Sequence, residues 1–293
     1  MTHRKTPKLI VSLFIAALLM LCLLVPGFAE TDAEAQLAAA NAEVAACEQA
    51  LKDANAAYTT AQEQSKKGMY GFFLANGSEN AVKTLDNAKY RNLISYGAAG
   101  DATSMENLSA ALDLLEEVNA VRKNQGLKEL VITDTMMAMA EADADAFYDL
   151  GVTPKQFTVN GNRIAENLGT FASAKAAVES WSSEKALAEE HPEYMDYSNA
   201  NWYRVGHWYN MTRENFQVTG VAVNTRQGNK FCQVFYGSAG NEKTYTVAEY
   251  RQRIADYNAS PEQKKQAVAD AETALANAKA KQAAAEAAVQ AEA

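Results

Sequence analysis

The stretch RVGHWYNMTRENFQVTGVAV, residues 204–223, is the most informative part of the chain. It contains His207, one of only three histidines, and the aromatic pair Trp208 and Tyr209 follows directly. A turn-like run over 210–215 then leads into an alternating apolar segment that is typical of a strand. A histidine among aromatic side chains just before a strand predicts one wall of a binding pocket.

The first 29 residues have the pattern of a secretory signal peptide. A basic start is followed by the apolar run LIVSLFIAALLMLCLLV (9–25), and small residues precede a cleavage site after Ala29. The alternative is an uncleaved anchor, because an apolar run of this length only just reaches the roughly 17–25 residues needed to span a membrane. In both cases the rest of the chain lies outside the cytoplasm. With cleavage, we expect a secreted or cell-surface protein that does not insert into the membrane.

Composition argues against nucleic acid as a partner. The full chain carries 27 basic and 36 acidic side chains, a formal net charge of −9. Cleavage would remove three basic residues and no acidic ones, which lowers the net charge to −12. No basic patch is available to neutralise phosphates. Two cysteines remain, Cys47 and Cys232, either bridged or, as we expect, as separate buried thiols.

Residues 30–67 contain an alanine-rich segment with a heptad pattern. Larger side chains at every seventh position alternate with small ones three residues later, which predicts a closely packed coiled-coil helix. The large positions are Leu37, Val44, Leu51 and Tyr58, and the small ones are Ala40, Cys47, Ala54 and Ala61.

The C-terminal segment, 241–293, repeats this pattern. Ser260 and Pro261 are typical of an N-cap and a first helical position, so a second long helix is expected from there. Its seam positions are Val268, Leu275, Gln282 and Val289, with Ala271, Ala278 and Ala285 between them. Matching seams predict that the two ends pair as an antiparallel hairpin. Pairing with other chains and partly disordered spacers are the alternatives.

Between these ends we expect a connector over 68–102 and one domain over 103–240. Helices are expected after Ser104, after Thr133 or Asp134, and over 174–190 behind Ser173 as N-cap. Strands are expected around the sequence RIAENLGTF (163–171) and on both sides of the turn 226–229. Helices around a small antiparallel sheet make an α+β fold, a three-layer α-β-α sandwich flanked by the coiled-coil helices.

Four motifs in this central region resemble those of the CAP superfamily, which includes cysteine-rich secretory, antigen 5 and pathogenesis-related proteins. They are NAVRKNQGLKEL (119–130), AENLGTF (165–171), WSSEK (181–185) and GHWYN (206–210) followed by the strand VTGVAV. The resemblance covers roughly 103–240 and is nearest to the bacterial, cysteine-poor branch. It implies an extracellular CAP-type domain.

The resemblance also implies a polar cleft. Glu166 is similar to the glutamate of the family's GEN motif, Glu184 to that of the W-x-x-E-K helix, and His207 to the histidine of the GHY motif. The family's second histidine has no counterpart here, because Asn160 stands six residues before Glu166.

The chemistry of such a cleft has several readings. Two carboxylates and one imidazole are the minimum set for a divalent cation such as zinc or calcium, so Glu166, Glu184 and His207 are candidate metal ligands. We expect no constitutive cofactor, since the second histidine is missing. A hydrolase needs a nucleophile beside a base, and Ser183 faces away from Glu184 on a helix. The remaining possibility is a hydrogen-bonded cluster that ties the elements together.

Aromatic residues predict what surrounds the cleft. We expect Asn160, Trp202, Tyr203, Trp208 and Tyr209 to form its rim, because rings with polar tips suit a groove for a glycan or a peptide. The sequence favours extracellular binding of a peptide, glycan or lipid over catalysis. One alternative is a metal-dependent hydrolase acting on peptide or cell-wall material. Another is a structural surface protein that assembles through its coiled-coil ends.

Overall fold

A computed structural model describes the backbone of residues 32–150, 158–159 and 162–293. The predicted signal peptide, 1–29, lies outside the described residues. The described chain forms two compact units, one containing residues 32–50 and 272–293 and the other Leu51–Ala271. The long helices α2 (Asp32–Ser65) and α10 (Val247–Glu292) contribute to both units.

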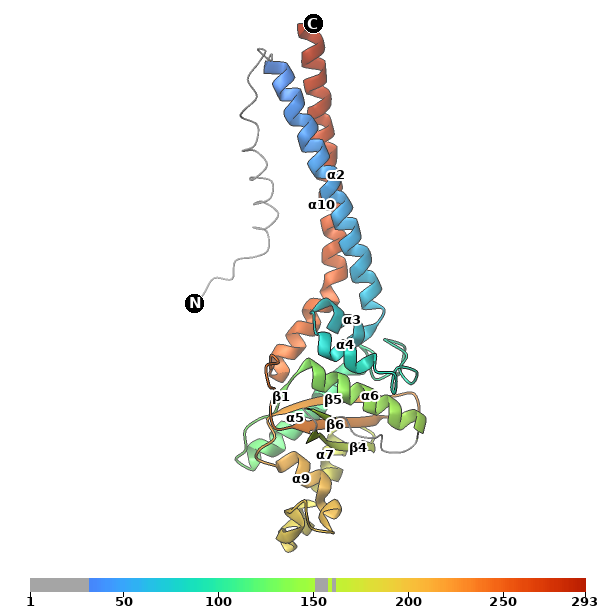
Figure 1. Cartoon of the computed structure of the whole chain (residues 1–293), viewed down its shortest axis with the longest axis vertical. Coiled ribbons are helices and arrows are strands. Elements are labelled where there is room, and N and C mark those ends of the chain that lie inside the picture. Colours follow the sequence, from blue (N-terminus) through green and yellow to red (C-terminus); the bar gives the residue numbers. More distant parts are fainter. Residues whose placement is uncertain (1–31, 151–157, 160–161) are drawn as a thin grey trace. The chain divides into compact units, whose positions relative to one another are not determined.

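In the first unit α2 and α10 pair with each other (Figure 1). Lys281 Nζ lies 2.6 Å from Glu43 Oε1, and Lys279 Nζ lies 3.5 Å from Glu48 Oε1. Residue numbers rise along one helix as they fall along the other, so the pair is antiparallel. Every predicted seam position from 37 to 61 and from 268 to 289 is buried or half-buried.

The start of the C-terminal helix was predicted wrongly. The helix α10 begins at Val247 and runs through Pro261, which is therefore an interior residue and not a first helical position. The earlier turns are held by packing, because Tyr250, Ile254 and Tyr257 are buried. That burial outweighs the hydrogen bond that proline cannot donate.

The connector forms two short helices, α3 (Gly68–Ala75) and α4 (Glu79–Leu85). Ser78 precedes α4 but does not cap it with its side chain; its hydroxyl donates to Asp134 instead. The apolar side chains of this segment enter the main core: Met69, Phe72, Phe73, Leu85 and Tyr90.

The second unit contains a four-stranded sheet in the order β1-β5-β6-β4. The strands β4, β6 and β5 pair antiparallel, as predicted, and Gly228 takes a positive φ of 74° in the turn between β5 and β6. The strand β1 pairs parallel with β5 and was not predicted, since two residues carry no periodicity. The bounds are β1 Val131–Ile132, β4 Ala165–Thr170, β5 Val218–Asn224 and β6 Lys230–Tyr236, with a separate pair β2 Thr158–Val159 and β3 Asn162–Arg163.

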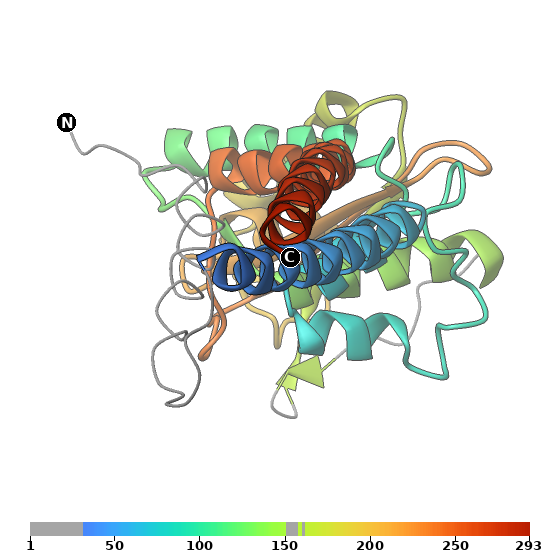
Figure 2. The same ribbon diagram turned by 90° about the horizontal axis from the view of Figure 1, so that it is seen from above.

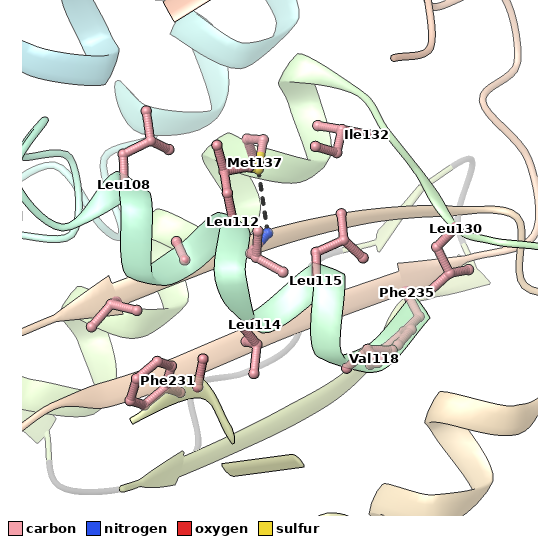
Figure 3. Packing of buried hydrophobic residues seen from close by; sticks show 14 of the residues in the cluster. Leu108, Leu112, Leu114, Leu115, Val118, Leu130, Ile132, Met137, Phe231 and Phe235 are labelled. Atoms are coloured by element: carbon pink, nitrogen blue, oxygen red, sulfur yellow. Dashed lines mark hydrogen bonds between the residues drawn. The ribbon is translucent and has the colours of Figure 1, made fainter. Parts of the chain in front are cut away.

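Helices α5 (Leu108–Asn124) and α6 (Asp134–Leu150) pack on the two faces of this sheet (Figure 2). Leucines of α5 meet Phe231 and Phe235 of β6 in the core that Figure 3 shows. On the other face, methionines and alanines of α6 meet alternate residues of β5 and β6, Val218, Ala222, Cys232 and Val234. Helix α6 lies so close that a Cβ on Gly220 would stand 1.9 Å from the Met136 carbonyl oxygen.

The remaining helices lie near the predicted cleft. The expected helix 174–190 is broken into α7 (Ala174–Ser182) and α8 (Lys185–Glu190), and the Ser173 hydroxyl caps α7 as predicted by accepting from Ala176 N–H at 3.2 Å. His207 does not lie on an approach to a strand but within α9 (Gly206–Thr212). Across the described ranges, no helix combines the length and apolarity that a membrane span requires.

Candidate functional site

The joint between α7 and α8 positions Glu184. Helix α7 ends at Ser182, and Glu184 is the residue directly before α8. The Ser183 hydroxyl donates back to the Ser180 carbonyl oxygen at 2.7 Å, so it is turned toward its own helix. Its neighbour Glu184 points away from α7, toward the start of α9.

The carboxylate of Glu184 makes three hydrogen bonds to the first turn of α9. One oxygen accepts from the backbone N–H groups of His207 at 2.9 Å and Trp208 at 3.0 Å. The other lies 2.6 Å from His207 Nδ1. The first N–H groups of a helix have no partner within the helix, and a carboxylate there also meets the positive end of the helix dipole. Glu184 therefore caps α9 and orients His207 with one group.

This geometry fixes the tautomer of the imidazole, that is, which ring nitrogen carries the proton. A carboxylate only accepts hydrogen bonds, so Nδ1 carries the proton. In the neutral ring Nε2 then keeps its lone pair, and within the described residues it has no hydrogen-bond partner. The His207 side chain is 39% exposed, whereas that of Glu184 is 19% exposed. With Nδ1 bonded to Glu184 and the ring partly exposed, Nε2 is the ring atom left to accept a hydrogen bond from a ligand.

Three further residues fix this part of the site, and sequence reasoning did not assign them a role. The ring of Trp181 stacks on His207 at 5.9 Å between centroids and 11° between planes. The Asn167 amide donates to the His207 carbonyl oxygen at 3.1 Å, and the Asn210 amide donates to Asn167 at 3.0 Å. Each belongs to a motif quoted above, so the motifs located these residues without indicating their contacts.

Glu166 does not join this pair. It pairs with Val234 in register, and its carboxylate lies 3.6 Å from the thiol of Cys232, on the face that α6 covers. Asn167, the next residue, contacts α9 from the opposite face. Successive side chains of a strand point to opposite faces, so the expected three-residue cleft is divided by the sheet.

Under α6, Glu166 belongs to a second cluster of acidic groups. The carboxyl of Asp143 is buried near that of Glu166, and within the described residues neither Asp143 oxygen nor Glu166 Oε2 has a hydrogen-bond partner. Burial raises the pKa of Glu166, and burial together with the charge of Glu166 raises the pKa of Asp143 well above its ordinary value. Burial also raises the pKa of the Cys232 thiol. These groups are favoured in their neutral forms.

The structure brings together two of the three candidate metal ligands, Glu184 and His207. In the part of the chain that the structure describes, no three His, Cys, Asp or Glu side chains come together as potential ligands. Glu184 and His207 supply two donors, one fewer than the three protein ligands typical of catalytic zinc. No zinc or calcium site is therefore assigned to Glu166, Glu184 and His207.

The predicted rim is also divided. Tyr203 is exposed and Trp202 half-buried, but Trp208 and Tyr209 are buried and belong to the interior. Both lie in α9, where only His207 and Thr212 are partly exposed. Asn160 lies outside the described residues. Cys47 and Cys232 are both free thiols.

The comparison with known families identifies this class of domain. Residues 115–250 match the model of the CAP family, described as the cysteine-rich secretory protein family. This region belongs to the CAP superfamily, which confirms the resemblance drawn from the motifs. The match includes Glu166, Glu184 and His207.

Solved structures include a similar chain, a cysteine-rich secretory protein from Staphylococcus aureus subsp. aureus Mu50. The sequence identity is 19% and the TM-score 0.29, and the match covers 45% of this chain and 39% of that chain. The present chain thus matches well under half of the length of that protein. No curated protein matches the chain.

Proposed function

We propose that the chain is an exported CAP-domain protein that binds an extracellular peptide, glycan or lipid at the Glu184–His207 pair. The main support is that the partly exposed imidazole of His207 is held by the Glu184 carboxylate at 2.6 Å. Polar groups that are positioned before a ligand arrives cost little to order on binding. The apolar N-terminal run and the acidic composition support export.

The proposal includes the finer architecture. The CAP domain is a three-layer α-β-α sandwich, and the paired helices at the ends form a coiled coil. The burial of the heptad positions and the Lys–Glu pairs between the helices support the coiled coil. The helix faces on both sides of the sheet support the three layers.

Binding is favoured over hydrolysis because, among the residues that the structure describes, no hydroxyl or thiol is hydrogen-bonded to the His207 ring. A histidine acts as a base on a neighbouring hydroxyl or thiol within hydrogen-bond reach. Ser183, the serine next to Glu184 in the chain, donates to the Ser180 carbonyl oxygen instead. The buried thiol of Cys232 lies with Glu166 under α6.

The location of the site can be tested without knowing the ligand. We would record the backbone amide spectrum of the isotopically labelled full chain with a fragment set of dipeptides, monosaccharides and short fatty acids. The proposal predicts that a binding fragment shifts the amide signals of His207 and Trp208. A rival location is the groove of about 560 Å³ between α5 and the start of α7, lined by Glu117, Ser173 and Phe231. The proposal would be refuted if the fragments shift only amide signals of residues in that groove. It would also be refuted if no fragment shifts the amide signal of His207.

A further inference from the structure

Two aromatic rings are exposed on the connecting loop between α8 and α9, residues 191–205, which includes the short 3-10 helices η1 (Pro192–Met195) and η2 (Trp202–Val205). Tyr197 is 58% exposed and Tyr203 is 66% exposed. Leu74 is the other large hydrophobic side chain that is exposed within the described residues, at 38%. Trp202 is half-buried and lies against Tyr197, with 4.6 Å between ring centroids and planes tilted by 40°. Clustered rather than scattered apolar exposure indicates an interaction surface.

The loop holds these rings in place before any ligand binds. Asp196 accepts hydrogen bonds from the Ser198 amide at 2.8 Å and from the Ser198 hydroxyl at 2.7 Å. The side chain of Asn199 accepts from the Asn201 amide at 2.8 Å. Such local bonds fix turns, so the rings lose little conformational freedom on binding.

A second layer supports the loop from beneath. Tyr194 is buried, stacked on His191 at 4.7 Å, with the Arg204 guanidinium 5.5 Å from its ring centroid. Trp202 lies over Gly206, where a Cβ would stand 3.1 Å from the indole. Gly206 directly precedes His207, so the segment that carries the rings leads along the chain into the Glu184–His207 pair.

We infer that Tyr197, Trp202 and Tyr203 form a platform that binds an uncharged pyranose oligosaccharide. One face of a pyranose ring carries C–H groups that stack on an aromatic ring, while its edges carry hydroxyls. Planar amides and carboxylates offer paired donors and acceptors to such hydroxyls. Asn199, Asn201 and Asp196 supply these groups beside the rings.

The surroundings favour a sugar over the other ligands. A fatty-acyl chain needs an enclosed apolar channel, whereas these rings lie on an exposed loop with hydroxyl tips. An extended peptide is commonly held by a free strand edge or a groove, and the loop provides neither. The net negative charge of the chain disfavours an anionic polymer.

This inference rests on the proposed function, because it names the ligand class of the surface around His207. The test is titration calorimetry of the full chain with cellotetraose, maltotetraose and the tetramer of N-acetylglucosamine. At least one should bind. Tyr203→Ala should weaken that binding by about tenfold or more, as truncation of an aromatic anchor does. Tyr203→Phe should keep most of the affinity, and Leu74→Ala, the matched control on another exposed surface, should leave it unchanged.

The outcomes separate the two proposals. If no oligosaccharide binds while fragments still shift His207, the platform is refuted and the proposed function stands. If an oligosaccharide binds through Tyr203 but leaves His207 unshifted, the platform stands and the proposed site fails. Binding to phosphatidylcholine vesicles that Tyr203→Ala abolishes, without oligosaccharide binding, would make the rings a membrane contact and overturn the inference.

Discussion

At the scale of single residues, Glu184 is the side chain on which the site depends. It satisfies two backbone N–H groups of α9 and the ring of His207 at once. Removing it would leave these donors without a partner in a largely buried position. The same carboxylate therefore acts in stability and in the orientation of His207.

Glu184→Ala should lower the free energy of unfolding by about 1–2 kcal/mol, as the loss of a helix cap does. Urea denaturation measures the effect. Glu179→Ala is the matched control, because Glu179 lies in the preceding helix α7 and is exposed, and its Lys175 contact of 3.8 Å contributes little. Equal stability of the two variants would contradict the capping role.

Asp143 and Glu166 predict how stability depends on pH. Their pKa values are raised by burial, so both are favoured as neutral acids in the folded chain. The stability they support is complete below the ordinary carboxyl pKa of about 4, and it is lost as the pH rises through their raised folded-state values. The folded chain should therefore weaken toward alkaline pH at this cluster.

Asp143→Asn should make that pH dependence shallower, because the asparagine amide donates to Glu166 without a titrating proton. The free energy of unfolding of both chains should be measured from pH 5 to pH 9. As the pH rises, that of the variant should increase relative to that of the parent chain. The exposed Asp256 offers a control, Asp256→Asn, that should leave the slope unchanged. A constant difference between Asp143→Asn and the parent chain would show that the pair does not titrate in this range.

The candidate site could be predicted at this scale only in part. Motif spacing located Glu184 and His207, which the structure brings together. It also located Glu166, but consecutive polar residues at 166 and 167 give no indication of which one faces which side of a strand. The apolar pattern that settles such a choice elsewhere is missing at this point of β4.

Among helices and strands, the features that were predicted correctly are those set by neighbouring residues in the sequence. The Ser173 cap and the turn around Gly228 are decided by neighbouring residues, and both were predicted. Helix α9 was missed because it is short and is capped by Glu184, 22 residues before its first residue, Gly206. The start of α10 was missed because burial of Tyr250 and Ile254 overrides the local signal of Ser260 and Pro261.

Pro261→Ala should raise the free energy of unfolding by about 1–3 kcal/mol, because proline in a helix interior removes a hydrogen bond and crowds the preceding turn. Ser260→Ala should have almost no effect within a continuous helix. The opposite pattern, in which Ser260→Ala costs about 1 kcal/mol and Pro261→Ala stabilises nothing, would mean that a separate helix begins there.

For the molecule as a whole, the helices at the two ends of the described chain, α2 and α10, pair with each other. The heptad positions of α2 and α10 are buried or half-buried, and the Gln282 amide donates to the Asn41 side-chain oxygen at 2.7 Å. We therefore expect the seam to be filled within one chain rather than by another copy. Sequence alone allowed either kind of pairing, since a heptad pattern specifies a seam but not the chain that fills it.

The chain without its N-terminal segment 1–29 should therefore be a monomer whose mass is independent of concentration in light scattering. Removing residues 272–293 should also reduce the helicity of 32–50, because an isolated helix of that length is marginal in water. A mass that rises with concentration in the longer chain, and falls to that of a monomer on truncation, would instead support assembly through the ends.

The central claim is that Glu184 holds His207 as an exposed acceptor for an extracellular ligand. A long-range proton–nitrogen spectrum of the imidazoles tests it most directly, with His191→Asn used to assign the signals. We expect a protonated Nδ1 and an unprotonated Nε2 in His207, and a shift of the Nε2 signal when a fragment or oligosaccharide binds. A proton on Nε2 in the neutral ring, or an Nε2 signal that no bound ligand moves, would contradict it.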